Sequence, residues 1–364
     1  MNKATSHIIR QINSRFWPKH LYYPPKWIVL GVNNICNLHC KMCDVGTKSL
    51  DTNFATNLVG TQPMNMPEEL FRRIADQTHN FFPKAKLGYG FTEPLVYPYL
   101  LETLDYANNK GLYTSITTNA LNLPQKAEQL VRAGLNEVFI SLDGPQEIHN
   151  YIRGHKSSFQ RAIKGIEMLL EHSKELEIGV FCVITEWNIG HLKAFVDFFK
   201  DFPLKRLGFM HTNFTPQGVA DIHNMLYSDS YPATNSNVDE IDISKMDLNI
   251  LWEEIRSIKS EQYRFPVTFS PEVESYEGLL DFYQKPEKLI GKRCHDVFNN
   301  IMIKSDGSVI PAHGRCYNLT VGNLYKDDLN SIWNSSEISQ FRDTLNKAGG
   351  LLPACSRCCS AFAR

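Results

Sequence analysis

Short apolar segments alternate with segments of helical periodicity along the first two thirds of the chain, and from Ile28 onward this alternation repeats about six times. Several of the short segments are apolar at consecutive positions, which is typical of strands buried on both faces between helices. The pattern therefore predicts a parallel β-sheet, with strands at 28–32, 86–89, 112–117, 137–142, 177–184 and 205–210.

The segments between these strands carry the signals that begin and end helices. Pro67 followed by Glu68 and Glu69 fits a helix N-terminus, and Gly111 and Gly134 fit the left-handed position at which a helix ends. Six strand–helix units in series predict the α/β class and a closed or partly open barrel. Active sites of barrels lie at the C-terminal ends of the strands, so we expect functional motifs directly after them.

The pattern changes on both sides of the predicted barrel core at 28–215. Residues 1–27 interleave cations with aromatic side chains; we expect an arm that packs across the bottom of the barrel, the alternatives being a membrane face or a partner. Residues 216–290 predict an insert that covers the substrate as a lid. At 291–364 a β-hairpin around Gly307 and a helix predict a small second domain that binds a cluster.

Composition narrows the class of protein. The chain has 364 residues, 43% of them hydrophobic, and a formal net charge of −1. This profile is that of a folded globular chain, and it argues against nucleic acid as a partner. No run of about 18 apolar residues and no export signal are present, so we expect a cytoplasmic protein without membrane association. Its nine cysteines then predict metal binding or catalysis and not disulfides.

The first cysteine cluster directly follows the first predicted strand. Cys36, Cys40 and Cys43 form a Cys-x3-Cys-x2-Cys arrangement. Three thiolates this close can hold three corners of an iron–sulfur cubane and leave the fourth iron open to a ligand. The alternative is a zinc site with His39 or a distant residue as fourth ligand.

These residues resemble the radical S-adenosylmethionine (SAM) superfamily, which implies a partial (β/α)6 barrel. In this family the open iron of a 4Fe-4S cluster binds the methionine part of SAM. Met42 stands where this family commonly has an aromatic residue. Three further motifs after successive strands support the resemblance. Glu93 lies in a segment that is similar to the family's Gly-Gly-Glu-Pro motif, although both glycines are missing. The resemblance implies that SAM is bound by Glu93, by Thr118 and Asn119, and by Ser141 and Asp143.

A second cysteine set lies near the C-terminus. Cys294 precedes the predicted hairpin, Cys316 follows it, and Cys355 and Cys358 form a Cys-x2-Cys pair, with Cys359 as a neighbour that could replace Cys358. The set resembles the twitch or SPASM extension of the radical SAM superfamily, which implies one auxiliary 4Fe-4S cluster. A structural zinc ion is the alternative. Four protein ligands would leave no open iron, so the cluster would carry electrons.

The resemblance implies a radical SAM oxidoreductase that removes a hydrogen atom from a small polar substrate, sugar-like or aminocyclitol-like, with the auxiliary cluster as electron acceptor. A flavodoxin-type or ferredoxin-type protein would supply electrons. Epimerisation or decarboxylation is the first alternative, with Cys182 as a candidate hydrogen donor, although a cysteine within a buried strand is usually a packing side chain. Two further alternatives are an enzyme that modifies a ribosomal peptide and a binding module without catalytic activity that metal ions stabilise. Oligomeric state and substrate identity are not predicted.

Overall fold

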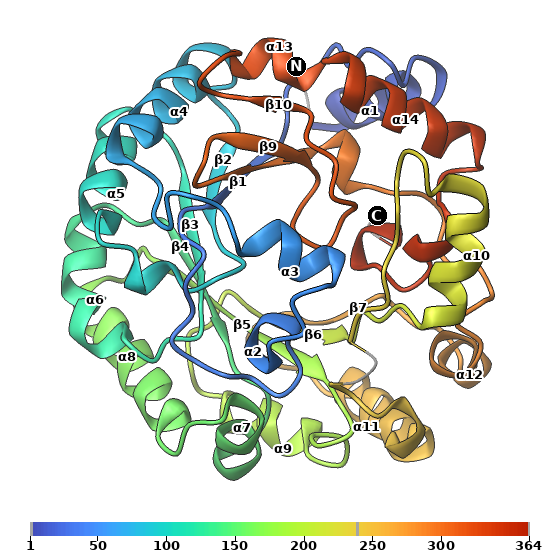
Figure 1. Ribbon diagram of the computed structural model, residues 1–364. Helices are drawn as coiled ribbons and strands as arrows, with labels where there is room; N and C mark the ends of the chain where they lie inside the picture. The colour runs from blue at the N-terminus through green and yellow to red at the C-terminus, as the bar shows by residue number, and fades with distance from the viewer. Residues whose placement is uncertain (1–2, 238–239, 363–364) are drawn as a thin grey trace.

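One sheet of ten strands curves around the centre of the computed structural model, and helices surround it (Figure 1). The structure describes residues 3–237 and 240–362. The sheet has the order β10-β9-β8-β1-β2-β3-β4-β5-β6-β7. The strands are β1 (Trp27–Gly31), β2 (Lys86–Tyr89), β3 (Thr114–Thr118), β4 (Glu137–Ser141), β5 (Glu177–Ile184), β6 (Arg206–His211), β7 (Val267–Ser270), β8 (Asn300–Lys304), β9 (Ser308–Pro311) and β10 (Gly322–Asn323).

Strands β1 to β7 pair in parallel, which confirms the predicted α/β class and partial barrel. All six predicted strands are present. The sequence pattern missed β7, which extends the sheet beyond β6. The predicted C-terminal hairpin is also present as β8 and β9, but it joins the same sheet, because β8 pairs in parallel with β1.

The helices connect successive strands and form the outer ring, except for α2 and α3, which lie at the centre of the barrel in Figure 1. They are α1 (Lys3–Phe16), α2 (Asp44–Thr47), α3 (Asn53–Leu58), α4 (Glu68–Phe81), α5 (Leu100–Asn109), α6 (Leu123–Arg132), α7 (Gln146–Arg153), α8 (Ser158–His172), α9 (Leu192–Phe198), α10 (Gln217–Tyr227), α11 (Leu248–Ser260), α12 (Tyr276–Gln284), α13 (Leu329–Trp333) and α14 (Ser336–Lys347). The predicted insert at 216–290 contains the helices α10, α11 and α12 and the strand β7.

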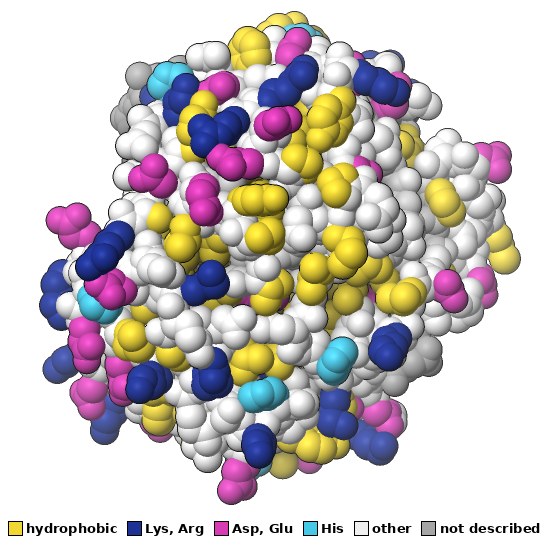
Figure 2. Space-filling model, turned by 60° about the vertical axis from the view of Figure 1, so that its left-hand side comes forward, with side chains coloured by type: hydrophobic (Ala, Val, Ile, Leu, Met, Phe, Trp, Pro, Cys, Tyr) yellow, Lys and Arg dark blue, Asp and Glu magenta, His cyan; other side chains and the backbone are white. Residues whose placement is uncertain are grey.

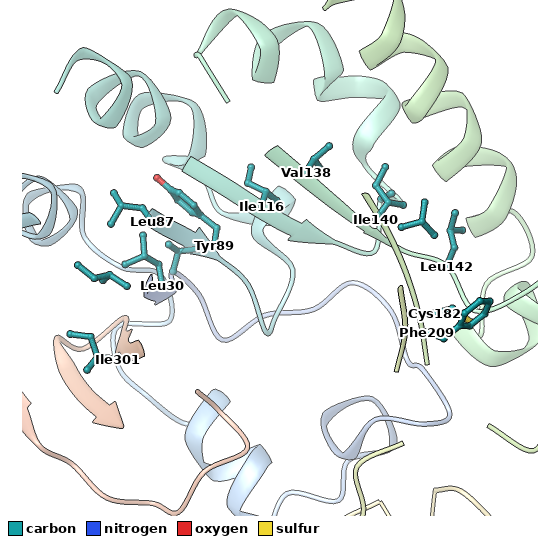
Figure 3. Close-up of a cluster of buried hydrophobic side chains, with 14 of the residues drawn as sticks. Leu30, Leu87, Tyr89, Ile116, Val138, Ile140, Leu142, Cys182, Phe209 and Ile301 are labelled. Atoms are coloured by element: carbon teal, nitrogen blue, oxygen red, sulfur yellow. The ribbon is translucent and has the colours of Figure 1, made fainter. Parts of the chain in front are cut away.

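The two faces of the sheet bury different sets of side chains. On the inner face, Met302 of β8 packs with Phe54 and Leu58 of α3. On the outer face, alternate residues of each strand form the layer beneath the helices, for example Leu30, Ile116 and Ile140 (Figure 3). This separation decides which strand residues can face a bound substrate.

The surface shows no field of one charge on the face seen in Figure 2, where acidic and basic side chains are interspersed with hydrophobic ones. This agrees with the near-zero net charge. Among the described residues, no helix has the length and apolar character needed to cross a membrane.

Candidate active site

The first cysteine set lies on the loop between β1 and α2, at the C-terminal end of the barrel strands. The loop is tightly folded, because a Cβ at Gly46 would stand 2.6 Å from the carbonyl oxygen of Cys40. Burial raises the pKa of Cys36, and it raises the pKa of Cys40 to about 12. Metal binding at these thiols therefore releases protons. Three sulfur donors on one loop, without a fourth protein ligand assigned to them, fit a cluster with one open iron.

Glu93 is the centre of a buried hydrogen-bond network next to this loop. Its Oε1 accepts from Thr118 Oγ1 at 2.6 Å and from the backbone N–H of Leu95 at 2.8 Å, and its Oε2 accepts from the N–H of Asn119 at 2.8 Å. Burial raises the pKa of Glu93 despite these bonds. The side chain of Asn119 continues the network and donates to Asn37 at 2.8 Å and to Cys36 Sγ at 3.8 Å. The structure thus brings three predicted residues, Glu93, Thr118 and Asn119, to the cysteine loop.

Asp143 reaches the cysteine loop through a residue that the sequence reasoning missed. Arg153, at the end of α7, donates from Nε to Asp143 Oδ2 at 2.5 Å and from Nη1 to Cys40 Sγ at 3.8 Å. Burial lowers the pKa of Arg153, but Asp143 and Cys40 raise it by more, so its pKa lies above the ordinary value. The signal for this role is weak in one sequence, since a helical arginine followed by Gly154 is most simply a helix end.

The remaining two predicted barrel residues lie on different faces of the sheet. Ser141 ends β4 on the face that carries Phe139, whose ring packs against Phe181 of β5. Cys182 lies on the opposite face of β5, in the layer between sheet and helices, together with Leu142 and Phe209 (Figure 3). Its side chain is fully buried there. The structure therefore places Ser141 toward the barrel interior and Cys182 away from it.

The second cysteine set surrounds a cavity in the C-terminal part of the chain. Its wall includes all four predicted ligands, Cys294, Cys316, Cys355 and Cys358. Burial raises the pKa of Cys294 and Cys316 well above the ordinary value, and that of Cys355 to about 11. Four thiols around one cavity fit a cluster or zinc ion that is fully ligated by protein.

The pair Cys358 and Cys359 adjoins His313, and their candidate ligand atoms all lie within 4.8 Å of one another. Hydrogen bonds from Cys359 and His313 hold the pKa of Cys358 well below its usual value. His313 Nε2 also lies 3.0 Å from Ser360 Oγ and 3.3 Å from Asp296 Oδ2. Cys358, and not Cys359, lines the cavity together with the other three cysteines, so Cys358 stays the predicted ligand of the pair.

Two contacts join the cysteine sets across the barrel interior. Asn57 of α3, which follows the first cysteine loop, donates to the carbonyl oxygens of Gly314 at 3.0 Å and Cys316 at 2.8 Å. The ring of Phe91, two residues before Glu93, stacks on the ring of His313 at 5.7 Å. Phe91 adopts φ +76°, a conformation that favours glycine, so this contact is made at the cost of backbone strain.

Part of the predicted lid covers the first cysteine loop and the cavity. Asp44, fully buried directly after Cys43, accepts from Ser236 Oγ at 2.8 Å and from the N–H of Asn237 at 3.3 Å. Ser236 and Thr234 also line the cavity. The insert therefore contacts both the cluster loop and the cavity, and its role as a lid stays a prediction.

Comparison with protein families gives two matches. Residues 31–199 match the model of the Radical SAM superfamily, and residues 294–359 match the model of the SPASM iron–sulfur cluster-binding domain. The second match begins at Cys294 and ends at Cys359, so it contains the whole second cysteine set.

Relatives and solved structures agree with these matches. The chain is 27% identical over 211 residues to Fe-coproporphyrin III synthase of Methanosarcina barkeri, covering 57% of this chain and 50% of the relative. It is 22% identical over 340 residues to the subtilosin biosynthesis protein AlbA of Bacillus subtilis, covering 92% and 64%. The chain thus spans about half to two thirds of these relatives' length. The Streptococcus suis SuiB structure with precursor peptide SuiA has a TM-score of 0.62 at 17% identity, covering 93% of this chain and 72% of that one.

Proposed function

From the premise that this chain belongs to the radical SAM superfamily and carries a SPASM domain, we propose that it oxidises a carbon–hydrogen bond of a small polar substrate. The radical SAM domain binds a 4Fe-4S cluster and SAM, and the SPASM domain binds auxiliary iron–sulfur clusters. In this proposal the substrate lies between the two cysteine sets and loses two hydrogens.

When bound, these groups would supply one-electron chemistry. One-electron reduction of SAM, with uptake of one hydrogen atom from the substrate, would give methionine and deoxyadenosine, and an auxiliary cluster would be an acceptor for the electron that remains when a second hydrogen leaves as a proton. Cys36, Cys40 and Cys43 are the ligands we assign to the first cluster. Glu93 offers a buried carboxylate to a cationic amino group of SAM, and Arg153 offsets the negative charge of the Cys40 thiolate.

The arrangement of the second cysteine set is the observation that carries the oxidation. Four thiols line its cavity, so a cluster bound there has a full set of protein ligands and no position for substrate. Such a cluster is suited to electron transfer and not to substrate binding. The bonds from Asn57 to the Cys316 loop support a fixed distance between the two sets.

The rest of the cavity wall offers a few polar groups to a hydroxylated substrate. Asn213 and Thr215 contribute an amide and a hydroxyl, which can both donate and accept hydrogen bonds, whereas Asn53 and Thr234 bond to each other and Ser236 bonds to Asp44. Aromatic side chains from three segments, Phe54, Phe214 and Tyr317, complete the wall.

The test is anaerobic turnover of the reconstituted protein with dithionite, SAM and a panel of sugars and aminocyclitols in heavy water. We expect one class to stimulate deoxyadenosine release and to yield a product lighter by two hydrogens. The variant Cys316→Ala should retain release of deoxyadenosine but form no oxidised product, whereas Cys40→Ala should lose both. A product that gains one deuterium without loss of mass would refute oxidation and indicate epimerisation. The position of Cys182 outside the interior weighs against that thiol as its hydrogen donor.

Peptide modification is the second candidate, favoured by the names of relatives such as AlbA and by the similarity to the SuiB fold. It differs from the first candidate in a measurable way. If no small molecule stimulates deoxyadenosine release while a peptide does, and the peptide changes mass, the substrate class proposed here is wrong although the radical chemistry stands.

A further inference from the structure

Helix α1 packs against the protein with its polar side and turns its apolar side to solvent. Asn13 is 4% exposed and Ser14 is 6% exposed, whereas Phe16 is 64% exposed. Ile8, Ile9 and Ile12 are exposed as well. In a helix of 3.6 residues per turn these four apolar positions occupy one side, roughly 100° wide. A helix that stabilises only its own fold would bury this side.

The polar side of α1 is held by specific bonds to the C-terminal part of the chain. Arg10 donates to Asn299 Oδ1 at 3.3 Å, and Arg293 donates to the carbonyl oxygen of Ser14. Within the N-terminal segment, Asn13 Oδ1 accepts from the N–H of Tyr22 at 2.7 Å. These bonds fix the orientation of α1. The exposure of its apolar side is therefore a consequence of the fold. The expectation of an arm packed across the barrel bottom did not include this orientation.

The exposed side continues past the helix end with Trp17 and Tyr22, which are 57% and 74% exposed. Indole and phenol rings of this kind are enriched where protein meets the boundary between water and lipid. We define the docking face as the exposed side chains of Ile8, Ile9, Ile12, Phe16, Trp17 and Tyr22.

Charge around the docking face favours an anionic partner. Residues 8–27 contain four basic residues, Arg10, Arg15, Lys19 and Lys26, and no Asp or Glu, although the whole chain has a net charge of −1. Arg15 borders the apolar stripe and is exposed. Lys19 and Lys347 share one carboxylate, Asp343, at 3.5 and 2.9 Å, which leaves an excess of positive charge there.

We propose that the docking face binds the surface of a membrane that contains anionic lipid. An amphipathic helix with isoleucine and aromatic residues on one side and cations beside them lies in the lipid interface with its apolar side down. The cations add attraction to anionic headgroups. A second copy of the chain fits this face less well. A two-fold contact would bring the Arg15 side chains of both copies into one interface, and the docking face contains no carboxylate to offset their charge.

The test is co-sedimentation of the full reconstituted chain with vesicles of phosphatidylcholine, with and without one third phosphatidylglycerol. We expect binding to the anionic vesicles that weakens when salt is raised, and at least tenfold weaker binding for Ile12→Glu. The matched control is Ile250→Glu on α11, because both isoleucines are 46% exposed. It should bind as the unchanged protein does.

Charge reversal at two sites, Arg15→Glu with Lys19→Glu, should weaken binding to anionic vesicles and leave the far-ultraviolet circular dichroism unchanged. Failure to bind anionic vesicles, equal binding to neutral ones, or equal loss in Ile250→Glu would each overturn the proposal. A dimer in sedimentation that Ile12→Glu dissociates, without vesicle binding, would assign the docking face to a second copy.

Discussion

The pair formed by Arg153 and Asp143 gives the most direct test of how the site is supported. Asp143 is fully buried and Arg153 nearly so. Replacement by Arg153→Met leaves a buried carboxylate without its cation, and breaking such a pair costs about 3–5 kcal/mol of unfolding free energy. Asp143→Asn should cost less, because the amide oxygen of the new side chain can still accept from the N–H of Val183, a bond of 3.1 Å in the present structure.

The double variant separates charge pairing from packing. With Arg153→Met and Asp143→Asn combined, no unpaired charge remains, so we expect a loss of only about 1–2 kcal/mol. The coupling free energy from the four proteins should then be at least about 1 kcal/mol. The assay is urea unfolding of the metal-free proteins, monitored by circular dichroism. Additive losses, with a coupling near zero, would refute the view that this pair holds α7 against the cysteine loop.

Three further predictions concern single residues. Glu93→Gln replaces a carboxylate oxygen that accepts from the N–H of Asn119 by an amide group. The dissociation constant for SAM should therefore rise about tenfold or more, as measured by calorimetry on the reconstituted protein. Cys358→Ser should lose the iron of one cluster per chain in a metal assay, and Cys359→Ser should retain it; the reverse result would reassign the ligand. Burial lowers the pKa of His211 from 6.5 in the unfolded chain to about 3 in the folded protein. Folding therefore favours the neutral imidazole, and the free energy of unfolding decreases as the pH falls below 6.5. Between pH 7 and pH 5 the unchanged protein should lose about 2 kcal/mol more than His211→Gln.

The sequence pattern predicts the barrel well because each strand–helix unit is a local signal. Strands such as 177–184 are long, apolar and flanked by turn residues, and the structure contains that strand with the same bounds. Strand β7 has four residues, one of them exposed, and it follows a segment without clear period, so no local pattern indicated it. The helix α10 was missed for a similar reason: Ile222, Met225 and Leu226 are exposed, so its apolar positions do not mark a buried side.

The candidate site is predictable where chemistry is concentrated in short motifs. Three cysteines within eight residues, or a Cys-x2-Cys pair, indicate metal binding from spacing alone. Arg153 was missed because its partners lie 10 and 113 residues away, and only the fold brings them together. The direction in which α1 faces also depends on tertiary contacts, since a helix with an apolar stripe normally buries it.

The parallel pairing of β1 with β8 has a consequence for how the chain is made. These strands are neighbours in the sheet, but about 270 residues separate Ile28 from its partner Ile301. At a synthesis rate of roughly 5–20 residues per second, this edge of β1 stays unpaired for on the order of 14–54 seconds until β8 is made. During that interval the nascent barrel exposes an apolar strand edge, which is where chaperones act and where aggregation begins. A ribosome that stops before residue 304 therefore releases a sheet whose first strand is still open on one side.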